Sequence, residues 1–335
     1  MIRSCIGCGI KLQSINKGEL GFIPEDKFDK SKFCQRCFRL SNYSDLKEAS
    51  LNKDNADIIK TVNKKSELSF YLVDFLNINS ETIEMFKKIT TDKVLVISKI
   101  DILPKSIKKQ LIINWLKDDW DIKEEIILLS SNKNYAINSI INTMDKKKKR
   151  VAYLLGYTNA GKSTLINKIL EKYKNEVGKI TTSNLPNTTL DFIRIPIDEL
   201  TIVDSPGFVM KNNFYELNES DLIKRLNYKN IINPVTYQVK SGTSILIEER
   251  LRVISADDNS WTIYANNNLN LRKVYEKNET CMDKDSKVLE LADDSDIVIK
   301  GIGFINVKKA CKIIIYLDLL ELVEVRESFF RSMGE

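Results

Sequence analysis

The chain has 335 residues, 43% of them hydrophobic, so it is long enough for two or three domains with cores of their own. A net charge of +6 with 29% charged residues indicates a mild basic bias, and no apolar stretch of the roughly 18 residues that a membrane span needs is present. The chain has no histidine, which excludes every metal site, triad or general base that needs imidazole.

Two CxxC pairs open the chain. Cys5 and Cys8 form the first pair, and Cys34 and Cys37 form the second, within a compact module predicted over residues 1–45. Four thiolates suit a tetrahedral Zn²⁺ whose role is structural. Because no signal or transit peptide is recognisable before Cys5, we expect a reducing, cytoplasmic location and no disulfide framework.

A polar segment from about Lys47 to Lys65 is typical of a linker with room for a short helix. From Leu68 onward, short apolar strands alternate with amphipathic helices, which predicts a largely parallel α/β sheet covered on both faces. The predicted strands are Phe70–Val73, Val94–Ile97, Ile126–Leu129, Val151–Leu155, Phe192–Ile195 and Ile202–Val203. The predicted helices lie around residues 80–90, 107–118, 135–145 and 162–174.

A guanine-recognition motif is predicted at the end of the second strand. Ser98-Lys99-Ile100-Asp101 is similar to the Asn/Thr-Lys-x-Asp motif of GTPases, in which the aspartate accepts both N–H donors on the guanine edge. Lys99 would lay its aliphatic stem over the base. Ser98 is shorter than the residue that usually ties this loop to the phosphate loop, which leaves the affinity open. Ser130 and Ser131, after the third strand, match the next guanine-binding loop.

The run Asp145–Arg150 contains four lysines and an arginine between the fourth predicted strand and the helix before it. Two interpretations stay open for this run. It forms either a solvated joint between segments that are chain ends in other GTPases, or a patch that contacts RNA.

The fourth strand leads into a phosphate loop, Gly156–Thr164, with the pattern Gly-x4-Gly-Lys-Ser at the start of a helix. In this context backbone N–H groups face the phosphates, Lys162 neutralises the β and γ oxygens, and Ser163 offers a hydroxyl to Mg²⁺. The residues assigned to the nucleotide phosphates are Gly156, Asn159, Ala160, Gly161, Lys162, Ser163 and Thr164.

Asp204-Ser205-Pro206-Gly207 follows the last predicted strand of this sheet, as the third GTPase motif does. Asp204 would hold Mg²⁺ through a water, and the Gly207 amide would sense the γ-phosphate. Thr189 is the favoured switch threonine and Mg²⁺ ligand, with Thr188 as the alternative. Phe208 follows the motif and cannot orient an attacking water as glutamine does.

Catalysis therefore needs charge from another source. The loop around Asn159 is similar to that of potassium-activated GTPases, in which this asparagine binds a K⁺ that stabilises the transition state. We expect a slow GTPase that K⁺ stimulates. Its catalytic residues would be Lys162, Asn159, Thr189, Asp204 and Gly207.

The order of these motifs is unusual, because the base-recognition half precedes the phosphate loop. This order predicts a circularly permuted P-loop GTPase domain over residues 46–215, flanked by the zinc module and by a β-rich α+β domain over 216–335. In that last domain a helical stretch is expected at Glu219–Leu226. Strands are predicted at Ser244–Ile247, Leu251–Ser255, Trp261–Ala265, Asp296–Lys300, Lys312–Leu317 and Leu322–Arg326. Because the switch motif runs directly into these strands, their orientation is expected to respond to the γ-phosphate.

The segments Cys5–Gln13, Leu20–Pro24 and Cys34–Leu40, with the permuted motif order, resemble the YqeH type of circularly permuted GTPase. The resemblance implies a bacterial, cytoplasmic GTPase that uses GTP, Mg²⁺ and structural Zn²⁺ and assists assembly of the small (30S) ribosomal subunit. Its partners would be rRNA or ribosomal proteins, and we expect a monomer without a membrane partner. Glu248 and Glu249 stand where that family usually has two glycines, and residues 216–335 carry a net charge of −3. Two alternatives are an RNA-binding scaffold in which hydrolysis is incidental, and a GTPase acting in tRNA modification.

Overall fold

The computed structural model describes residues 3, 5, 11–17, 19, 21–35, 55–173, 192–210, 214, 222, 225–226, 230–275 and 278–331. These residues form two compact units. The first unit comprises Met1–Asp74, Glu84–Lys99 and Glu124–Val209, and the second comprises Phe75–Ile83, Ile100–Lys123 and Met210–Glu335. The predicted boundaries at 45 and 215 fall on residues outside the described part of the chain and stay predictions.

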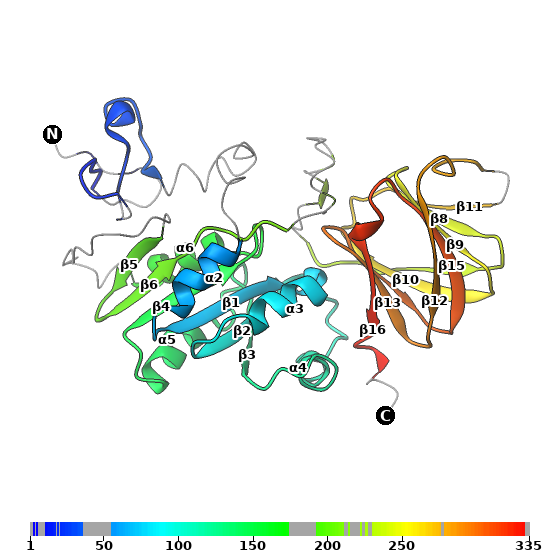
Figure 1. The fold of residues 1–335 in the computed structure, drawn as a ribbon, viewed down its shortest axis with the longest axis horizontal. Coiled ribbons are helices and arrows are strands. Elements are labelled where there is room, and N and C mark those ends of the chain that lie inside the picture. Colours follow the sequence, from blue (N-terminus) through cyan, green and yellow to red (C-terminus); the bar gives the residue numbers. More distant parts are fainter. Residues whose placement is uncertain are drawn as a thin grey trace. The chain divides into compact units, whose positions relative to one another are not determined.

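The first unit is built on a six-stranded sheet in the order β3-β2-β1-β4-β6-β5 (Figure 1). All neighbouring strands are parallel except β5, which pairs antiparallel with β6. The strands are β1 Leu68–Asp74, β2 Lys93–Ser98, β3 Glu125–Leu128, β4 Val151–Gly156, β5 Ile193–Ile197 and β6 Leu200–Asp204. The six strands expected from the sequence are confirmed. Every residue of β1 is buried, which is why its sequence is a continuous apolar run rather than an alternating one.

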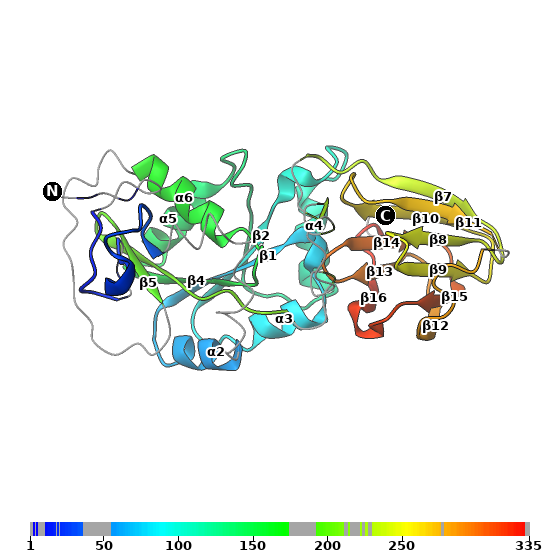
Figure 2. The ribbon, with the colours of Figure 1, turned by 90° about the horizontal axis from the view of Figure 1, so that it is seen from above.

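Helices precede the first strand and connect most of the following ones. They are α2 Asn55–Asn63, α3 Ser80–Lys87, α4 Lys109–Asp118, α5 Ile137–Lys146 and α6 Lys162–Tyr173, with 3₁₀ turns η1 Glu25–Lys27, η2 Phe75–Asn77 and η3 Ile100–Ile102. In Figure 2, α5 and α6 lie on one face of the sheet and α2 lies on the other, so the sheet is covered on both sides as expected. The short helix anticipated in the linker is α2.

The strand order places the phosphate loop and the base motif at the same edge of the sheet, although their order in the sequence is reversed. The phosphate-loop strand β4 lies between β1 and β6, and β2 with the base motif is the next strand beyond β1. Because β1, β2, β4 and β6 are parallel, their carboxyl ends meet at one edge of the sheet. The motifs that are reversed in the sequence are therefore brought to the same edge in space.

Three cations of the basic run are held by neighbours within the first unit. Lys147 pairs with Asp92 at 2.9 Å, Lys149 donates to the carbonyl oxygen of Ser66 at 2.8 Å, and Arg150 pairs with Glu199 at 3.1 Å. These contacts favour the interpretation of the run as a joint in the chain.

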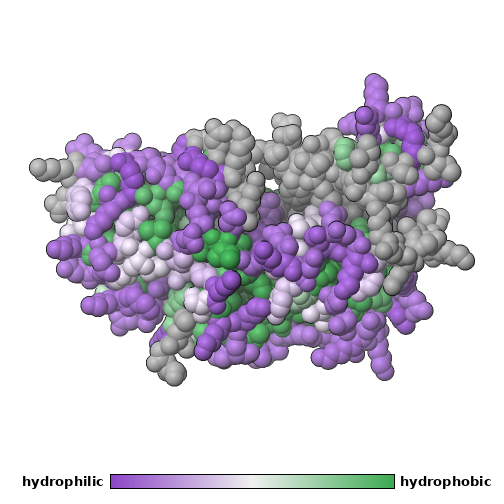
Figure 3. Space-filling model, turned by 180° about the vertical axis from the view of Figure 1, so that it is seen from behind, coloured by the Kyte–Doolittle hydropathy of each residue, from purple (hydrophilic) through white to green (hydrophobic). Residues whose placement is uncertain are grey.

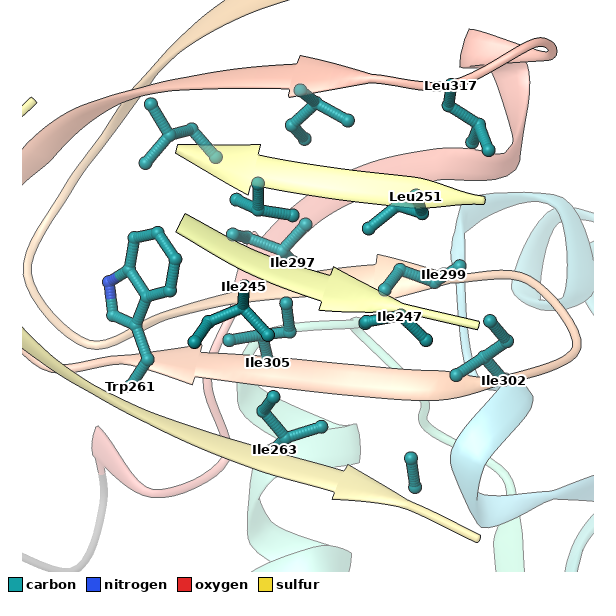
Figure 4. Packing of buried hydrophobic residues seen from close by; sticks show 14 of the residues in the cluster. Ile245, Ile247, Leu251, Trp261, Ile263, Ile297, Ile299, Ile302, Ile305 and Leu317 are labelled. Atoms are coloured by element: carbon teal, nitrogen blue, oxygen red, sulfur yellow. The ribbon is translucent and has the colours of Figure 1, made fainter. Parts of the chain in front are cut away.

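The second unit contains two five-stranded antiparallel sheets, in the orders β16-β13-β14-β10-β7 and β11-β8-β9-β15-β12. Ile245, Trp261, Ile297 and Ile305 are among the buried side chains that fill the space between the sheets (Figure 4). The strands are β7 Val235–Val239, β8 Ser244–Ile247, β9 Leu251–Ser255, β10 Asn259–Ala265, β11 Leu271–Val274, β12 Ser286–Leu291, β13 Ser295–Ile299, β14 Gly303–Val307, β15 Cys311–Tyr316 and β16 Val323–Glu327, and η5 Leu320–Leu322 precedes β16.

The six C-terminal strands predicted from the sequence are present, and β7, β11, β12 and β14 were missed. The expected helix at Glu219–Leu226 lies mostly outside the described residues. The tight turn between β8 and β9 has Glu248 and Glu249 in the left-handed region, each with φ of 54°. Arg225 and Arg272 hold the two carboxylates at 2.9 and 2.7 Å, so ion pairs accompany a conformation that glycine adopts more readily.

The surface in Figure 3 is mostly hydrophilic, with hydrophobic residues in smaller groups between. Within the described part of the chain, no helix has the length and apolarity to cross a membrane.

Candidate nucleotide-binding site

The phosphate loop connects β4 to α6 and depends on two glycines. Gly156 has a φ of 145°, and a Cβ on it would lie 2.3 Å from the carbonyl oxygen of Leu72 in β1. Gly161 has a φ of 93°. Asn159 also adopts a left-handed conformation, with a φ of 65°, and its side chain is exposed. The loop thus bends tightly against β1 and starts α6 at Lys162, which leaves the helix N-terminus at its mouth.

Lys162 is the buried cation of this loop. Its side chain is 6% exposed, and its ammonium donates to the carbonyl oxygens of Gly156 at 2.6 Å and Tyr157 at 3.3 Å. Burial lowers the pKa of Lys162 to about 8, and the carboxylate of Asp204 acts in the opposite direction. A buried ammonium whose present partners are neutral carbonyl oxygens is well placed to donate hydrogen bonds to a phosphate oxygen.

The segment after β6 packs directly on the phosphate loop. A Cβ on Gly207 would lie 3.0 Å from Cγ2 of Thr158 and 3.4 Å from the ammonium of Lys162. The Phe208 amide donates to the carbonyl oxygen of Gly156 at 3.1 Å, and the Thr158 amide donates to the carbonyl oxygen of Phe208 at 2.9 Å. These two bonds fix Gly207 beside the lysine that would meet the γ-phosphate.

The side chain of Phe208 is packed in the core of the first unit. Its side chain is fully buried, with its ring centroid 5.6 Å from that of Tyr157 and 6.0 Å from that of Tyr71. The side chain after the Asp-x-Pro-Gly motif is therefore part of the core and does not face an attacking water. This agrees with the expectation that Phe208 cannot replace a catalytic glutamine.

Ser98 joins the base motif to the phosphate loop. Its hydroxyl donates to the carbonyl oxygen of Ala160 at 2.6 Å, and the carbonyl oxygen of Val73 lies 3.4 Å away. Ser98 and Ala160 are both buried, at 2% and 3% exposure. The serine side chain is therefore long enough to form the hydrogen bond between the base motif and the phosphate loop.

Lys99 follows in a left-handed conformation with a φ of 58°, and its ammonium lies 3.3 Å from the carboxylate of Asp74. Asp74 ends β1, is 4% exposed, and stands beside Ser98 in the β1–β2 register. Asp74 was not predicted from the sequence as a site residue. The available signal was a carboxylate at the end of an apolar strand whose neighbour carries the base motif.

The second guanine loop is tightly folded. Ser130 and Tyr135 exchange backbone hydrogen bonds of 3.2 and 2.9 Å, and the Ser130 hydroxyl accepts from the Lys133 amide at 3.1 Å. Ser131 is 9% exposed. Both serines lie after β3 in the first unit. Asp101 lies on η3, in the second unit.

The remaining predicted ligands are only partly described. Ser163 and Thr164 lie in the first turn of α6, and Asp204 ends β6 beside Leu154 of β4. Thr188 and Thr189 fall outside the described residues. A helix N-terminus, a buried ammonium, a hydroxyl and a carboxylate are a donor set that fits a magnesium–nucleotide complex.

The cysteine module is described at two of its four predicted ligands. The Cys34 amide donates to the sulfur of Cys5 at 3.2 Å, and both cysteines are buried. Cys8 and Cys37 lie outside the described residues. Over the described residues alone, no group of three or more candidate metal ligands is found.

A phosphate loop on the central strand, with the base motif entering earlier in the chain on a parallel strand, defines a circularly permuted P-loop GTPase. A family described as "50S ribosome-binding GTPase" matches residues 151–266. The match begins at the first residue of β4, so the base-recognition strands β1, β2 and β3 lie before it.

The chain is 30% identical to YqeH of Bacillus subtilis (strain 168) over 345 residues, which covers 92% of this chain and 93% of that protein. The chain belongs to the YqeH family. It is also 24% identical over 253 residues to nitric oxide-associated protein 1 of Mus musculus, over 58% of this chain and 36% of that longer protein. The crystal structure of YjeQ from Thermotoga maritima aligns over 44% of this chain and 51% of its own, at 20% identity with a TM-score of 0.31.

The pKa of Lys162 predicts how nucleotide affinity depends on pH. Below about pH 8 the ammonium is charged in the free protein, so phosphate would bind without uptake of a proton by Lys162. Above about pH 8 Lys162 is neutral in the free protein and has to take up a proton when GDP binds. GDP affinity should therefore fall by up to about tenfold per pH unit, until the pH reaches the pKa of Lys162 in the complex. A titration with a fluorescent GDP analogue between pH 7 and 9 measures this.

The matched control is Lys162→Arg, which keeps its charge throughout this range. It should bind more weakly than the unaltered chain but with a flatter pH profile, and any titration of the base itself appears equally in both proteins. Parallel profiles for the two proteins would contradict the assignment.

Proposed function

We propose that this chain is a GTP hydrolase that assists assembly of the small ribosomal subunit, and that its nucleotide state controls its binding to rRNA or ribosomal proteins. One observation supports the nucleotide part above all. The Ser98–Ala160 hydrogen bond joins the base motif to a phosphate loop whose bonded residue lies 62 positions later in the chain. The ribosomal part rests on the family description and on a relative that covers nearly the whole chain.

In this proposal Asp101 reads guanine and Lys99 covers the base. Lys162 binds the β and γ oxygens, Ser163 and Asp204 hold Mg²⁺ with Thr189, and the Gly207 amide senses the γ-phosphate. Bound by these residues, Mg²⁺ would neutralise negative charge on the phosphate oxygens during transfer of the phosphoryl group to water. The position of Gly207 beside the Lys162 ammonium supports its role.

The proposal includes a structural Zn²⁺ held by Cys5, Cys8, Cys34 and Cys37. The Cys5–Cys34 contact supports it, because it brings one cysteine of each CxxC pair together. Metal analysis of the purified chain should give one zinc per protein, and Cys34→Ser should lose it. A purified, folded chain with no zinc would contradict this part.

The ribosomal role predicts that one subunit accelerates hydrolysis. The family description names the 50S particle, whereas the resemblance to the YqeH type implies the small subunit. Phosphate release should therefore be measured with purified 30S and 50S particles in parallel. We expect at least tenfold stimulation by 30S, a lower bound well below the roughly 10³–10⁵-fold that a partner-supplied arginine reaches in GTPases. Stimulation by 50S alone would reassign the partner, and equal rates with and without both particles would contradict the role.

The same assay in K⁺ and in Na⁺ tests Asn159. Its backbone conformation and exposed side chain leave it at the mouth of the loop, where a monovalent cation would supply positive charge near the transferred phosphoryl group. The rate should be higher in K⁺, and Asn159→Ala should remove the difference. Equal rates in both salts would remove K⁺ from the proposal.

A further inference from the structure

The residue predicted to read guanine belongs to the same compact unit as the C-terminal strands. Two inserted segments are part of the second unit: Phe75–Ile83, which directly follows β1, and Ile100–Lys123, which begins one residue after β2 has ended at Ser98. Asp101 lies on η3 at the start of the second of these segments. The next residue, Ile102, accepts a backbone hydrogen bond of 2.7 Å from Ile232, just before β7. The turn that carries Asp101 is therefore bonded to the C-terminal part of the chain.

These two inserted segments cover the outer face of the sheet that contains β13, β14 and β16. Side chains alternate along each strand, so the residues opposite the core side chains Ile297 and Ile305 point away from the sandwich. Asp296, Phe304 and Arg326 are on that outer face and are almost completely buried. Phe75 packs edge-on against Phe304, with the ring centroids 6.3 Å apart. Figures 1 and 2 both show α4 beside these strands.

Arg326 contacts both inserted segments at once. Its guanidinium pairs with Asp296 at 3.2 Å and donates to the carbonyl oxygen of Ile78 in the first segment. It also lies over the ring of Trp115 in the second segment, 4.9 Å from the centroid. Asn306 donates to Asp296 at 3.0 Å and completes the network. A fully buried charge with this many partners fixes the groups around it, because losing any partner is costly.

Polar contacts at the edge of this face also join the two inserted segments to the C-terminal strands. Glu324 accepts from the amide and hydroxyl of Ser80 at 2.8 and 2.6 Å, at the N-terminus of α3. Lys300 pairs with Glu81 at 3.0 Å. The indole of Trp115 donates to the carbonyl oxygen of Glu327 at 3.3 Å. Both inserted segments are thus attached to β16 by several independent contacts.

We propose that the C-terminal strands are a functional part of the guanine site, and that Arg326 is a positioning residue for the turn that carries Asp101. The proposal rests on the proposed guanine-nucleotide binding and deepens it. Packing on the outer face of β13, β14 and β16 sets the affinity for the base and has little influence on the affinity for phosphate. By linkage, a guanine nucleotide strengthens the same packing by the same factor.

The test uses the full chain with two probes, a fluorescent GDP analogue and inorganic pyrophosphate as its competitor. Arg326→Met should bind GDP about tenfold more weakly, within the usual range of coupling between sites, and Glu324→Ala roughly threefold more weakly. Pyrophosphate affinity should change less than twofold in both, which a merely structural loss would not produce. Glu327→Ala is the matched control on β16, since its exposed carboxylate pairs only with the neighbouring Arg331 among the described contacts.

Unchanged GDP affinity in folded variants, or equal losses for GDP and pyrophosphate, would overturn the proposal. If Arg326→Met does not fold, amide hydrogen exchange of the unaltered chain, with and without GDP, tests the proposal instead. GDP should slow exchange in residues 323–331, which include no predicted nucleotide ligand, and equal exchange with and without GDP would overturn it. Failure of the unaltered chain to bind GDP at all would instead contradict the proposed function.

Discussion

The hydrogen bond from the Ser98 hydroxyl to the carbonyl oxygen of Ala160 joins the predicted base motif to the phosphate loop, and the proposed nucleotide site depends on it. Circular permutation places the predicted base motif before the phosphate loop along the chain. What keeps the two halves together is the parallel pairing of β2, β1 and β4 and this one buried bond across their ends. A buried hydroxyl that bonds a loop carbonyl fixes the loop's position, since breaking the bond leaves an unsatisfied oxygen in the interior.

Permutation also decides what is attached to each half of the site. The sequence suggested that the segment after Asp204 carries the nucleotide signal into the C-terminal domain, because the chain continues that way. The structure adds a second connection, in which the segments after β1 and β2 belong to the C-terminal unit. Phe208 strengthens the first connection by packing in the core next to the phosphate loop. The residues proposed to read the base and to sense the phosphate thus both lie in segments that continue along the chain into the second unit.

The sequence predicted the parts of the fold whose burial is visible locally. The strands of the first sheet are apolar runs bounded by polar residues, and the motifs identify their carboxyl ends. The missed strands β7, β11 and β12 have mainly exposed or half-buried residues, so their pairing depends on distant partners rather than on a local pattern. β14 was not predicted because Gly301 and Gly303, just before and at its start, are typical of a loop. At the candidate site, the loop residues could be predicted from sequence motifs. The hydrogen bond of Ser98 to Ala160, the ion pair of Lys99 with Asp74 and the burial of Arg326 are tertiary features, which motif spacing does not predict.

The central claim is that the two halves of a permuted chain form one guanine-nucleotide site through Ser98. The most direct measurement is GDP affinity in Ser98→Ala, compared with Ser98→Thr, which keeps the hydroxyl. Losing a buried hydrogen bond of about 1 kcal/mol should weaken binding roughly fivefold in the alanine variant, and the threonine variant should bind nearly as the unaltered chain does. Equal GDP affinity in Ser98→Ala and in the unaltered chain would contradict the claim.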